Sequence, residues 1–226
     1  MPISQVRRVT ADRMSAAAHT TAAVTLTTEA DATELVRLRQ QIKDDGAPAV
    51  PSYNDLLAKL AAHALLEHPQ VNARFEGETI VQPASVNIGI AVDTERGLLV
   101  PVVQGVQAKS LRQIAETSAR LIEQARTGHI SADDMRGGTF TITNLGMFEI
   151  DAFTPIINLP ECAVLGVGRI IAKQVVVDAE AERVAIRRMM FLSLTFDHRL
   201  VDGAPAARFL QRVKQYVEKP YLWLTQ

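Results

Sequence analysis

Apolar residues recur with helical spacing in five segments of the chain, each separated from the next by turn-forming or alternating residues. The first segment carries three arginines and an alanine-rich second half, and the last follows a Gly-Ala-Pro run that is typical of a helix start. The predicted helices cover residues 5–18, 31–45, 53–68, 111–127 and 204–217.

Three of these helices begin at a recognisable capping sequence. Ser52 is placed to cap the third helix, and Ser110 with Gln113 forms a capping box at the start of the fourth. Asp31 followed by Glu34 resembles a capping box at the start of the second helix. The helix boundaries are therefore best defined at these three positions.

Alternation of apolar and polar residues predicts strands between and after the helices. Because long helices separate some strands and short turns separate others, the pattern predicts a mixed α/β domain in which successive strands need not be parallel neighbours. The predicted strands cover residues 24–30, 74–75, 79–81, 86–92, 98–103, 139–143, 162–167, 174–177 and 184–194.

The most informative stretch runs from Leu192 to Gly203, where a strand is followed by a tight turn and a helix. His198 lies at this corner, where a side chain can face a cleft while the flanking elements hold it still. Taken alone, His-x-x-x-Asp-Gly is a weak signal, and the simple alternative is a turn histidine followed by Asp202 as a helix cap. The rest of the chain favours a functional histidine.

Composition narrows the class of protein. The 226 residues are 47% hydrophobic and 22% charged with a net charge of −1, which is ordinary for a globular domain and suggests neither a nucleic-acid nor a membrane partner. The single cysteine, Cys162, excludes an internal disulfide and fits a reducing compartment. The N-terminal residues, including Met1, Pro2 and Ser4, lack a signal-peptide core. We expect one intracellular domain over residues 1–226, in the cytoplasm rather than the mitochondrial matrix.

Several segments then agree on one family. Residues 196–203, Phe-Asp-His-Arg-Leu-Val-Asp-Gly, resemble the signature of the 2-oxo acid dehydrogenase acyltransferases, the E2 core enzymes. Residues 137–146, Gly-Gly-Thr-Phe-Thr-Ile-Thr-Asn-Leu-Gly, resemble the second family motif. Residues 69–73, 94–102 and 154–158 also match, in the right order. The resemblance covers essentially the whole chain.

The resemblance implies a chloramphenicol acetyltransferase-like two-layer fold with a mixed sheet and flanking helices. It also implies a homotrimer with active sites between subunits, and trimers that often assemble into a cubic 24-mer or dodecahedral 60-mer. No lysine has the Asp-Lys-Ala context of lipoate attachment, so we expect the lipoyl and peripheral-subunit-binding domains to be absent from this chain. Lipoamide would arrive on a separate lipoyl domain, and the E1 and E3 components would bind through domains not present here.

Acyl transfer between thiols needs a base and a donor to the tetrahedral oxyanion. Neutral His198 can accept the proton of the coenzyme A thiol, because such thiols are mostly protonated at neutral pH. Thr143 stands where the family has Ser or Thr, and its hydroxyl would donate to the oxyanion. The resemblance implies that the two come from different subunits. We assign Asp202 to holding the loop, by capping the helix and pairing with an arginine, with Arg8 or Arg13 as the candidate.

The resemblance also implies that coenzyme A lies along backbone and small side chains. In this sequence these are Ser52, Asn144, Gly166 and Gly168. Three of the four assignments have equal alternatives. Gly166 and Gly168 could equally be glycines that strand packing requires. Ser52 could equally be a helix cap and nothing more.

Other candidate residues carry less chemistry. Cys162 lies in an apolar strand and is expected to be a core residue, and the remaining histidines show no metal-ligand spacing, so we predict no metal site. The Leu222-Trp223-Leu224 tail has two interpretations, a clasp on its own subunit or the anchor that joins E2 trimers, and we favour the anchor.

The acyl group is the least determined feature. Ala22-Ala23 replaces the Pro-His of many pyruvate-type members, and Glu149 replaces a frequent glycine, whereas residues 144–148 resemble acetyl-transferring enzymes, including acetoin-type complexes. We predict that the chain is a dihydrolipoamide acyltransferase, with acetyl as the favoured acyl group. The alternatives are a stand-alone acetyl-CoA-dependent O-acetyltransferase and a non-catalytic assembly scaffold. A Gly-x-Ser-x-Gly hydrolase elbow is absent.

Overall fold

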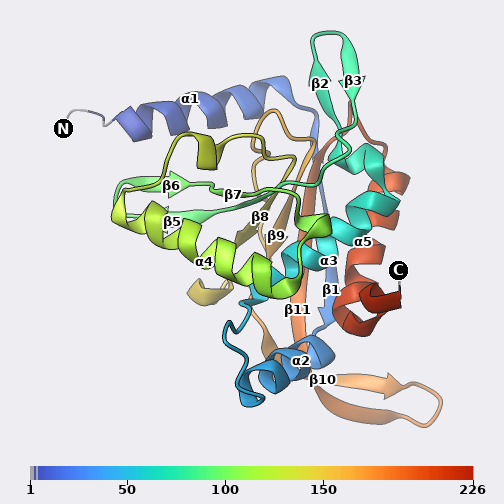
Figure 1. Cartoon of the computed structure of the whole chain (residues 1–226). Coiled ribbons are helices and arrows are strands. Elements are labelled where there is room, and N and C mark those ends of the chain that lie inside the picture. Colours follow the sequence, from blue (N-terminus) through green and yellow to red (C-terminus); the bar gives the residue numbers. More distant parts are fainter. Residues whose placement is uncertain (1–2, 4, 226) are drawn as a thin grey trace.

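The computed structural model describes residue 3 and residues 5–225; Met1, Pro2 and Ser4, which belong to the N-terminal stretch discussed above, lie outside the described residues (Figure 1). A seven-stranded mixed sheet forms the centre of the described chain. Its strands are β1 (Ala23–Asp31), β4 (Ile88–Ile90), β7 (Val102–Val103), β8 (Phe140–Asn144), β9 (Ala163–Val167), β10 (Ile171–Asp178) and β11 (Arg183–Asp197). They are ordered β1-β11-β9-β8-β4-β7, with β10 paired to β11. Pairs β4–β8 and β8–β9 are parallel and the others antiparallel, which confirms the predicted mixed arrangement.

The helices lie mainly against one face of this sheet (Figure 1). Apolar stripes of α2, α3 and α5 pack on the strands, and α4 packs on α3. The helices are α1 (Gln5–Thr20), α2 (Thr33–Asp44), α3 (Tyr53–Glu67), α4 (Leu111–Thr127) and α5 (Gly203–Glu218). Within the described residues, none of them is both long and apolar enough to cross a bilayer.

Two predicted strands are each divided in the structure. Residues 86–92 form β4 and then β5 (Val92–Thr94), and residues 98–103 form β6 (Gly97–Leu99) and then β7. Strands β5 and β6 pair only with each other and leave the main sheet as a hairpin. Pro101 lies at the division; it has no N–H to donate to a ladder, and its carbonyl accepts from the Ile90 amide instead. A second small hairpin consists of β2 (Arg74–Glu76) and β3 (Thr79–Val81).

Two predicted helix starts are confirmed and one is wrong. Ser52 forms a complete capping box with Asp55, and Ser110 forms one with Gln113. At α2, however, the N-cap residue is Ala32, which has no side-chain cap. Asp31 ends β1, and its carboxylate accepts the Thr33 amide at 2.9 Å and lies 3.6 Å from Nε of Arg187. The strand thus extends one residue beyond its predicted end. Because Asp31 belongs to the strand, it is not in the capping position of α2.

The sheet face away from α3 and α5 is polar, and a non-helical segment covers part of it. Hydroxyls of Thr25 and Thr195 lie 2.7 Å apart on this face. Residues 149–162, which we call the strap, run from the end of β8 back to the start of β9. Phe153 and Pro155 of the strap lie against Gly166 of β9. Because this face is hydroxyl-rich and only partly covered by the strap, it is suited to contacts with other molecules.

The C-terminal tail folds back on its own subunit. Residues Pro220–Thr225 form the 3-10 helix η5 after α5. Trp223 is partly buried in a small apolar pocket, with the Lys59 ammonium 5.7 Å from its ring centroid. Within a single chain, the tail thus packs on its own subunit, as the clasp interpretation predicts. The side chain of Leu224 lies outside the described residues, and the favoured role of the tail as an anchor between trimers stays a prediction.

Candidate active site

His198 lies in the turn between β11 and α5, as the sequence predicts. Its backbone amide donates to the carbonyl of Ala22 at 3.0 Å, which ties the turn to the start of β1. The imidazole is 44% exposed and packs on the buried ring of Phe196. Strand, helix and neighbouring strand therefore fix the backbone of a histidine whose ring remains accessible, which is what a proton-transfer base requires.

Asp202 does not have the predicted role within the chain. It occupies the N-cap position of α5, but its side chain makes no capping hydrogen bond and is 86% exposed. No ion pair from Asp202 to Arg8 or Arg13 is seen within the described residues, and the Asp202 carboxylate lies instead 3.8 Å from Nδ1 of His198. The side chain turns back toward the imidazole instead of toward the helix amides. This distance is too long for a direct hydrogen bond, and the two side chains form an ion pair only when the imidazole is protonated.

Asp197 is a site residue that the sequence analysis missed. Its carboxylate is buried and accepts two N–H groups of the Arg199 guanidinium, at 3.0 and 2.6 Å, and the amide of Ala22. Burial opposes its ionisation, but the hydrogen bonds and charge of Arg199 outweigh burial, so the pKa of Asp197 lies below its ordinary value. The sequence did contain a signal for Asp197, because an acidic and a basic residue flank the histidine in Asp-His-Arg.

Thr143 lies on β8 and is partly buried. It pairs with Gly166, which pairs in turn with Ser193 of β11, five residues before His198. Five residues along a strand and two strand spacings place the two side chains about 20 Å apart within one chain. Thr143 and His198 therefore cannot act on the same acyl group unless they come from different copies of the chain.

Three of the four residues predicted to contact coenzyme A line one groove of about 380 Å³. These are Ser52, Asn144 and Gly168. The Asn144 side chain donates to the Asn54 side chain at 2.8 Å and accepts the Gly146 amide at 2.8 Å. The groove is also lined by residues that the sequence analysis did not select: Tyr53, Asn54, Gly146, Met147, Val167, Arg169, Ile170 and Met190.

The structure does not bring Gly166 into this groove. It is buried in β9, and a Cβ atom there would meet the Phe153 ring at 3.2 Å and the Pro155 ring at 3.3 Å. The packing alternative therefore describes Gly166. Gly168 has both properties, because it lines the groove and a Cβ atom there would lie 1.7 Å from the carbonyl oxygen of Asp151.

Arg169 combines a groove position with a fixed geometry. Its Nε donates to Asp151 at 2.6 Å, and its backbone amide donates to the carbonyl of Ile150 at 2.8 Å. The hydrogen bond from Arg169 lowers the pKa of the Asp151 carboxyl. The signal for Arg169 in the sequence is its position directly after the Gly-Val-Gly that ends β9.

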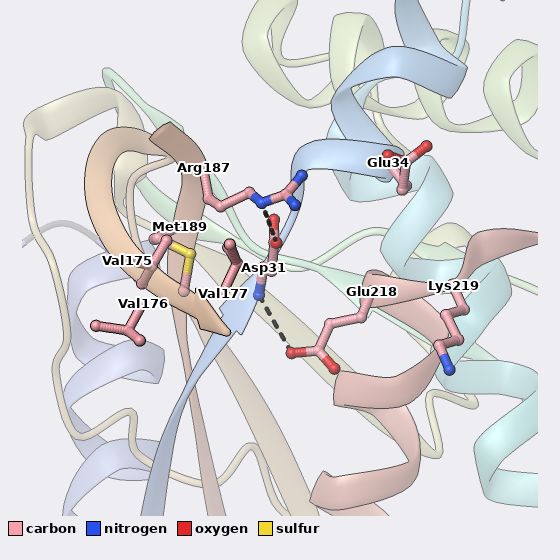
Figure 2. A pocket seen from close by; sticks show the side chains of 9 residues that line it. All are labelled: Asp31, Glu34, Val175, Val176, Val177, Arg187, Met189, Glu218 and Lys219. Carbon is pink, nitrogen blue, oxygen red and sulfur yellow. Dashed lines mark hydrogen bonds and ion pairs between the residues drawn. The ribbon is translucent and has the colours of Figure 1, made fainter. Parts of the chain in front are cut away.

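A cavity larger than this groove lies far from the site (Figure 2). It has a volume of about 510 Å³ and lies between the ends of β1, β10 and α5. Figure 2 shows Arg187 facing Asp31, 3.6 Å away, and the Asp31 amide donating to Glu218. Met189, which lines this cavity, is nine residues from His198, or roughly 30 Å along β11. Volume alone would select the wrong site.

Two further predictions concern side chains outside the site. Cys162 is fully buried in the core, as predicted, and burial raises the pKa of its thiol to about 12. In the part of the chain that the structure describes, no group of three His, Cys, Asp or Glu side chains could hold a metal ion.

The sequence matches the family described as 2-oxoacid dehydrogenases acyltransferase (catalytic domain) over residues 1–225. The chain belongs to this family. Similar proteins include the dihydrolipoyllysine-residue succinyltransferase component of the 2-oxoglutarate dehydrogenase complex of Bartonella vinsonii, 40% identical over 96% of this chain and 53% of that protein. The dihydrolipoyllysine-residue acetyltransferase of the acetoin cleaving system of Bacillus subtilis is 36% identical over 97% of this chain and 55% of that protein. The chain thus spans about half the length of these curated relatives.

Solved structures agree with this family and with the predicted fold. Azotobacter vinelandii dihydrolipoamide acetyltransferase has a TM-score of 0.94 and 36% identity, over 99% of this chain and 93% of that chain. Its catalytic mechanism was studied through a serine, a histidine and an asparagine four residues after the histidine. Chloramphenicol acetyltransferase, 15% identical over 96% of this chain and 98% of that chain, has a TM-score of 0.58, which confirms the predicted fold class.

Proposed function

We propose that this chain transfers an acyl group, most readily acetyl, between dihydrolipoamide and coenzyme A, in a homotrimer in which His198 of one subunit meets Thr143 of the next. The observation that carries the proposal is the half-exposed imidazole of His198, held at a rigid turn in a chain of the acyltransferase family. The Azotobacter vinelandii relative supports the choice of these residues, because its mechanism was studied through a serine, a histidine and an asparagine four positions after the histidine. In this chain, Thr143 would take the place of the serine, His198 that of the histidine and Asp202 that of the asparagine.

The separation of Thr143 and His198 supports a shared site. About 20 Å lie between them in one chain, too far for one tetrahedral intermediate to contact both. The surface beside Thr143 is also suited to a second copy, because large apolar side chains are exposed there along the end of η4 (Gly146–Phe148) and the strap. These are Met147 (71% exposed), Phe148 (56%), Ile150 (39%) and Ile156 (52%).

In the proposed reaction, neutral His198 accepts the proton of the coenzyme A thiol as its sulfur attacks the acyl-dihydrolipoamide carbonyl. The Thr143 hydroxyl donates a hydrogen bond to the oxyanion of the tetrahedral intermediate. Collapse of the intermediate breaks the bond to the dihydrolipoyl sulfur, and the imidazolium returns its proton to that sulfur. The products are acyl-coenzyme A and dihydrolipoamide, and the base is regenerated. Asp202, close to Nδ1 of His198, stabilises the imidazolium between the two proton transfers.

Coenzyme A would occupy the groove lined by Ser52, Asn144 and Gly168. Arg169 supplies a cation there for the anionic phosphate groups, and the strap holds it in place through Asp151. Dihydrolipoamide would arrive on a lipoyl domain separate from residues 1–226, and E1 and E3 components would bind to segments outside this chain. Trimers would assemble further into a 24-mer or 60-mer through the C-terminal tail.

The test is transfer of acetyl from acetyl-coenzyme A to free dihydrolipoamide, which is the same reaction in reverse. His198→Ala is expected to lower kcat by about 10²–10⁴-fold and Thr143→Ala by about 10²–10³-fold, whereas Thr143→Ser should retain most activity. Succinyl-coenzyme A in parallel tests the acyl group, because relatives of both kinds exist.

Other outcomes would select the alternatives. Acetylation of free hydroxyl compounds without a need for dihydrolipoamide would favour the O-acetyltransferase. A fully assembled wild-type particle that transfers neither acyl group would favour the scaffold. Equal activity of wild type and His198→Ala would exclude His198 as the base.

A further inference from the structure

The direction of the His198 ring depends on the turn that carries it. Apart from its packing on the Phe196 ring, its side-chain contacts are weak, since Asp202 is 3.8 Å away and 44% of the side chain is exposed. The firm contact is the backbone hydrogen bond from His198 to Ala22. Any residue that fixes the backbone of this turn, residues 197–201, therefore controls where the imidazole points.

Asp197 holds the turn from several sides. Its backbone amide donates to Cys162 of the strap, and its backbone carbonyl accepts the amides of Leu200 and Val201. Its carboxylate, 2% exposed, accepts the amides of Ala22 and Arg199. A buried carboxylate is costly without a cationic partner, and the forked guanidinium of Arg199 supplies the charge and two hydrogen bonds.

Arg199 is in turn covered by a ring from a distant part of the chain. Its guanidinium carbon lies 5.1 Å from the centroid of the partly buried Phe75 ring, within the range of a cation–π contact. The Arg199 side chain as a whole is 46% exposed. The ring therefore limits the positions that the guanidinium can take while it stays paired with Asp197.

Phe75 belongs to the hairpin of β2 and β3, which stands away from the body of the molecule at the end of the sheet where β1 begins (Figure 1). Each strand has three residues, and Phe75 pairs across the hairpin with Ile80, which is 50% exposed. A two-stranded hairpin of this length is marginally stable alone, so its contacts with the body decide its position. Asn72 fixes its base, donating to the carbonyls of Pro83 and Ser85.

We propose that Phe75 and Arg199 are positioning residues for the proposed reaction, so that the β2–β3 hairpin sets the direction of the His198 imidazole through Asp197. The proposal rests on the proposed function for its kinetic readout, but its structural readout does not. It assigns a role in the active site to a hairpin 120 residues before the catalytic turn, in a segment that no catalytic motif of the sequence includes.

The test compares Phe75→Leu with Phe75→Tyr in the assembled protein, with Ile80→Ala as the control on the same hairpin. Phe75→Leu keeps an apolar side chain but removes the ring, and it is expected to lower kcat about 10-fold while the KM for coenzyme A stays within about two-fold. Phe75→Tyr keeps the ring and should restore kcat, and Ile80→Ala should match wild type. Arg199→Lys, which keeps the charge but loses the fork, should behave like Phe75→Leu.

The independent readout is the rate at which diethyl pyrocarbonate modifies His198, followed by mass spectrometry of its peptide. Phe75→Leu should change this rate at least two-fold, and Ile80→Ala should not. The proposal is overturned if Phe75→Leu has wild-type kcat and modification rate, or if its lost activity equals the fraction of protein that is unfolded. A wild type without transfer activity contradicts the proposed function only, because the modification rates still decide whether Phe75 positions His198.

Discussion

Among single residues, Glu161 has the most unusual environment. Glu161 is 3% exposed. One oxygen of its carboxyl group accepts a hydrogen bond from the side-chain amide of Asn158 at 3.0 Å, and the other oxygen has no hydrogen-bond partner among the described residues. Burial raises its pKa from 4.5 to about 8, and hydrogen bonds from Thr141 and Asn158 reduce the shift only in part. Near neutral pH this carboxyl is mainly protonated in the folded protein.

Glu161 should therefore make the protein less stable as the pH rises. Between about pH 4.5 and pH 8 the folded state binds this proton and the unfolded state releases it, so the free energy of unfolding falls with increasing pH, by up to about 1.4 kcal/mol per unit. Glu161→Gln removes the proton and with it this slope. The measurement is urea unfolding at several pH values across this window.

The comparison concerns slopes, because the Gln amide has its own fixed cost in a site with few acceptors. Glu149→Gln, at an exposed position, is the control and should unfold with the wild-type pH dependence. Parallel curves for wild type and Glu161→Gln would show that Glu161 is charged in the folded protein and would contradict the prediction.

Among the structural elements, the strap links the groove to the sheet, and its backbone approaches Gly168 closely. A Cβ atom at Gly168 would lie 1.7 Å from the Asp151 carbonyl oxygen, so Gly168→Ala must displace backbone. We expect it to cost about 3 kcal/mol or more of stability, or to move the strap and raise the KM for coenzyme A at least 10-fold.

Gly166→Ala is the matched comparison on the same strand. Its Cβ atom would be 3.2 Å from the Phe153 ring and 3.3 Å from Pro155, contacts that small shifts of side chains can relieve. Its loss of stability should be clearly smaller. Thermal unfolding and coenzyme A kinetics of both variants decide the order, and equal effects would contradict the close approach at Gly168.

Local sequence predicted the elements whose determinants are local. Ser52 and Ser110 cap the helices α3 and α4 as predicted, because a capping box is complete within four residues. The division of residues 86–92 and 98–103 was not predicted, since it depends on how β5 and β6 pair away from the sheet. Asp31 failed as a cap for the same reason: its strand continues through pairing with Met189 of β11.

The same distinction applies to the candidate site. His198 and Thr143 could be selected from motifs, and three of the four residues expected to contact coenzyme A line one groove, so that their role stays a prediction. Phe75, by contrast, meets Arg199 only in the folded chain, and no local pattern marks Phe75 as part of a site. The φ of 62° at Glu149 is left-handed, a backbone conformation that favours glycine, which fits the glycine that the family resemblance led us to expect there.

For the whole molecule, the decisive prediction is complementation between inactive subunits. His198→Ala chains retain Thr143, and Thr143→Ala chains retain His198. When the two are unfolded and reassembled together, each mixed trimer should contain roughly one interface in three with both intact groups, so activity should return well above that of either variant alone. The control is the double variant His198→Ala with Thr143→Ala, mixed with either single variant. Recovery absent from fully assembled mixtures would place the whole reaction within one chain.

The separation of Thr143 and His198 along the sheet also determines how the protein fails. In the proposed trimer, every chain serves two active sites, lending a base to one neighbour and an oxyanion donor to the other. Damage that unfolds a single chain therefore inactivates two of the three active sites of the trimer. Under heat or proteolysis, catalytic output should decline faster than the count of intact chains, and a lone, freshly synthesised chain would be inert toward thioesters until its neighbours arrive.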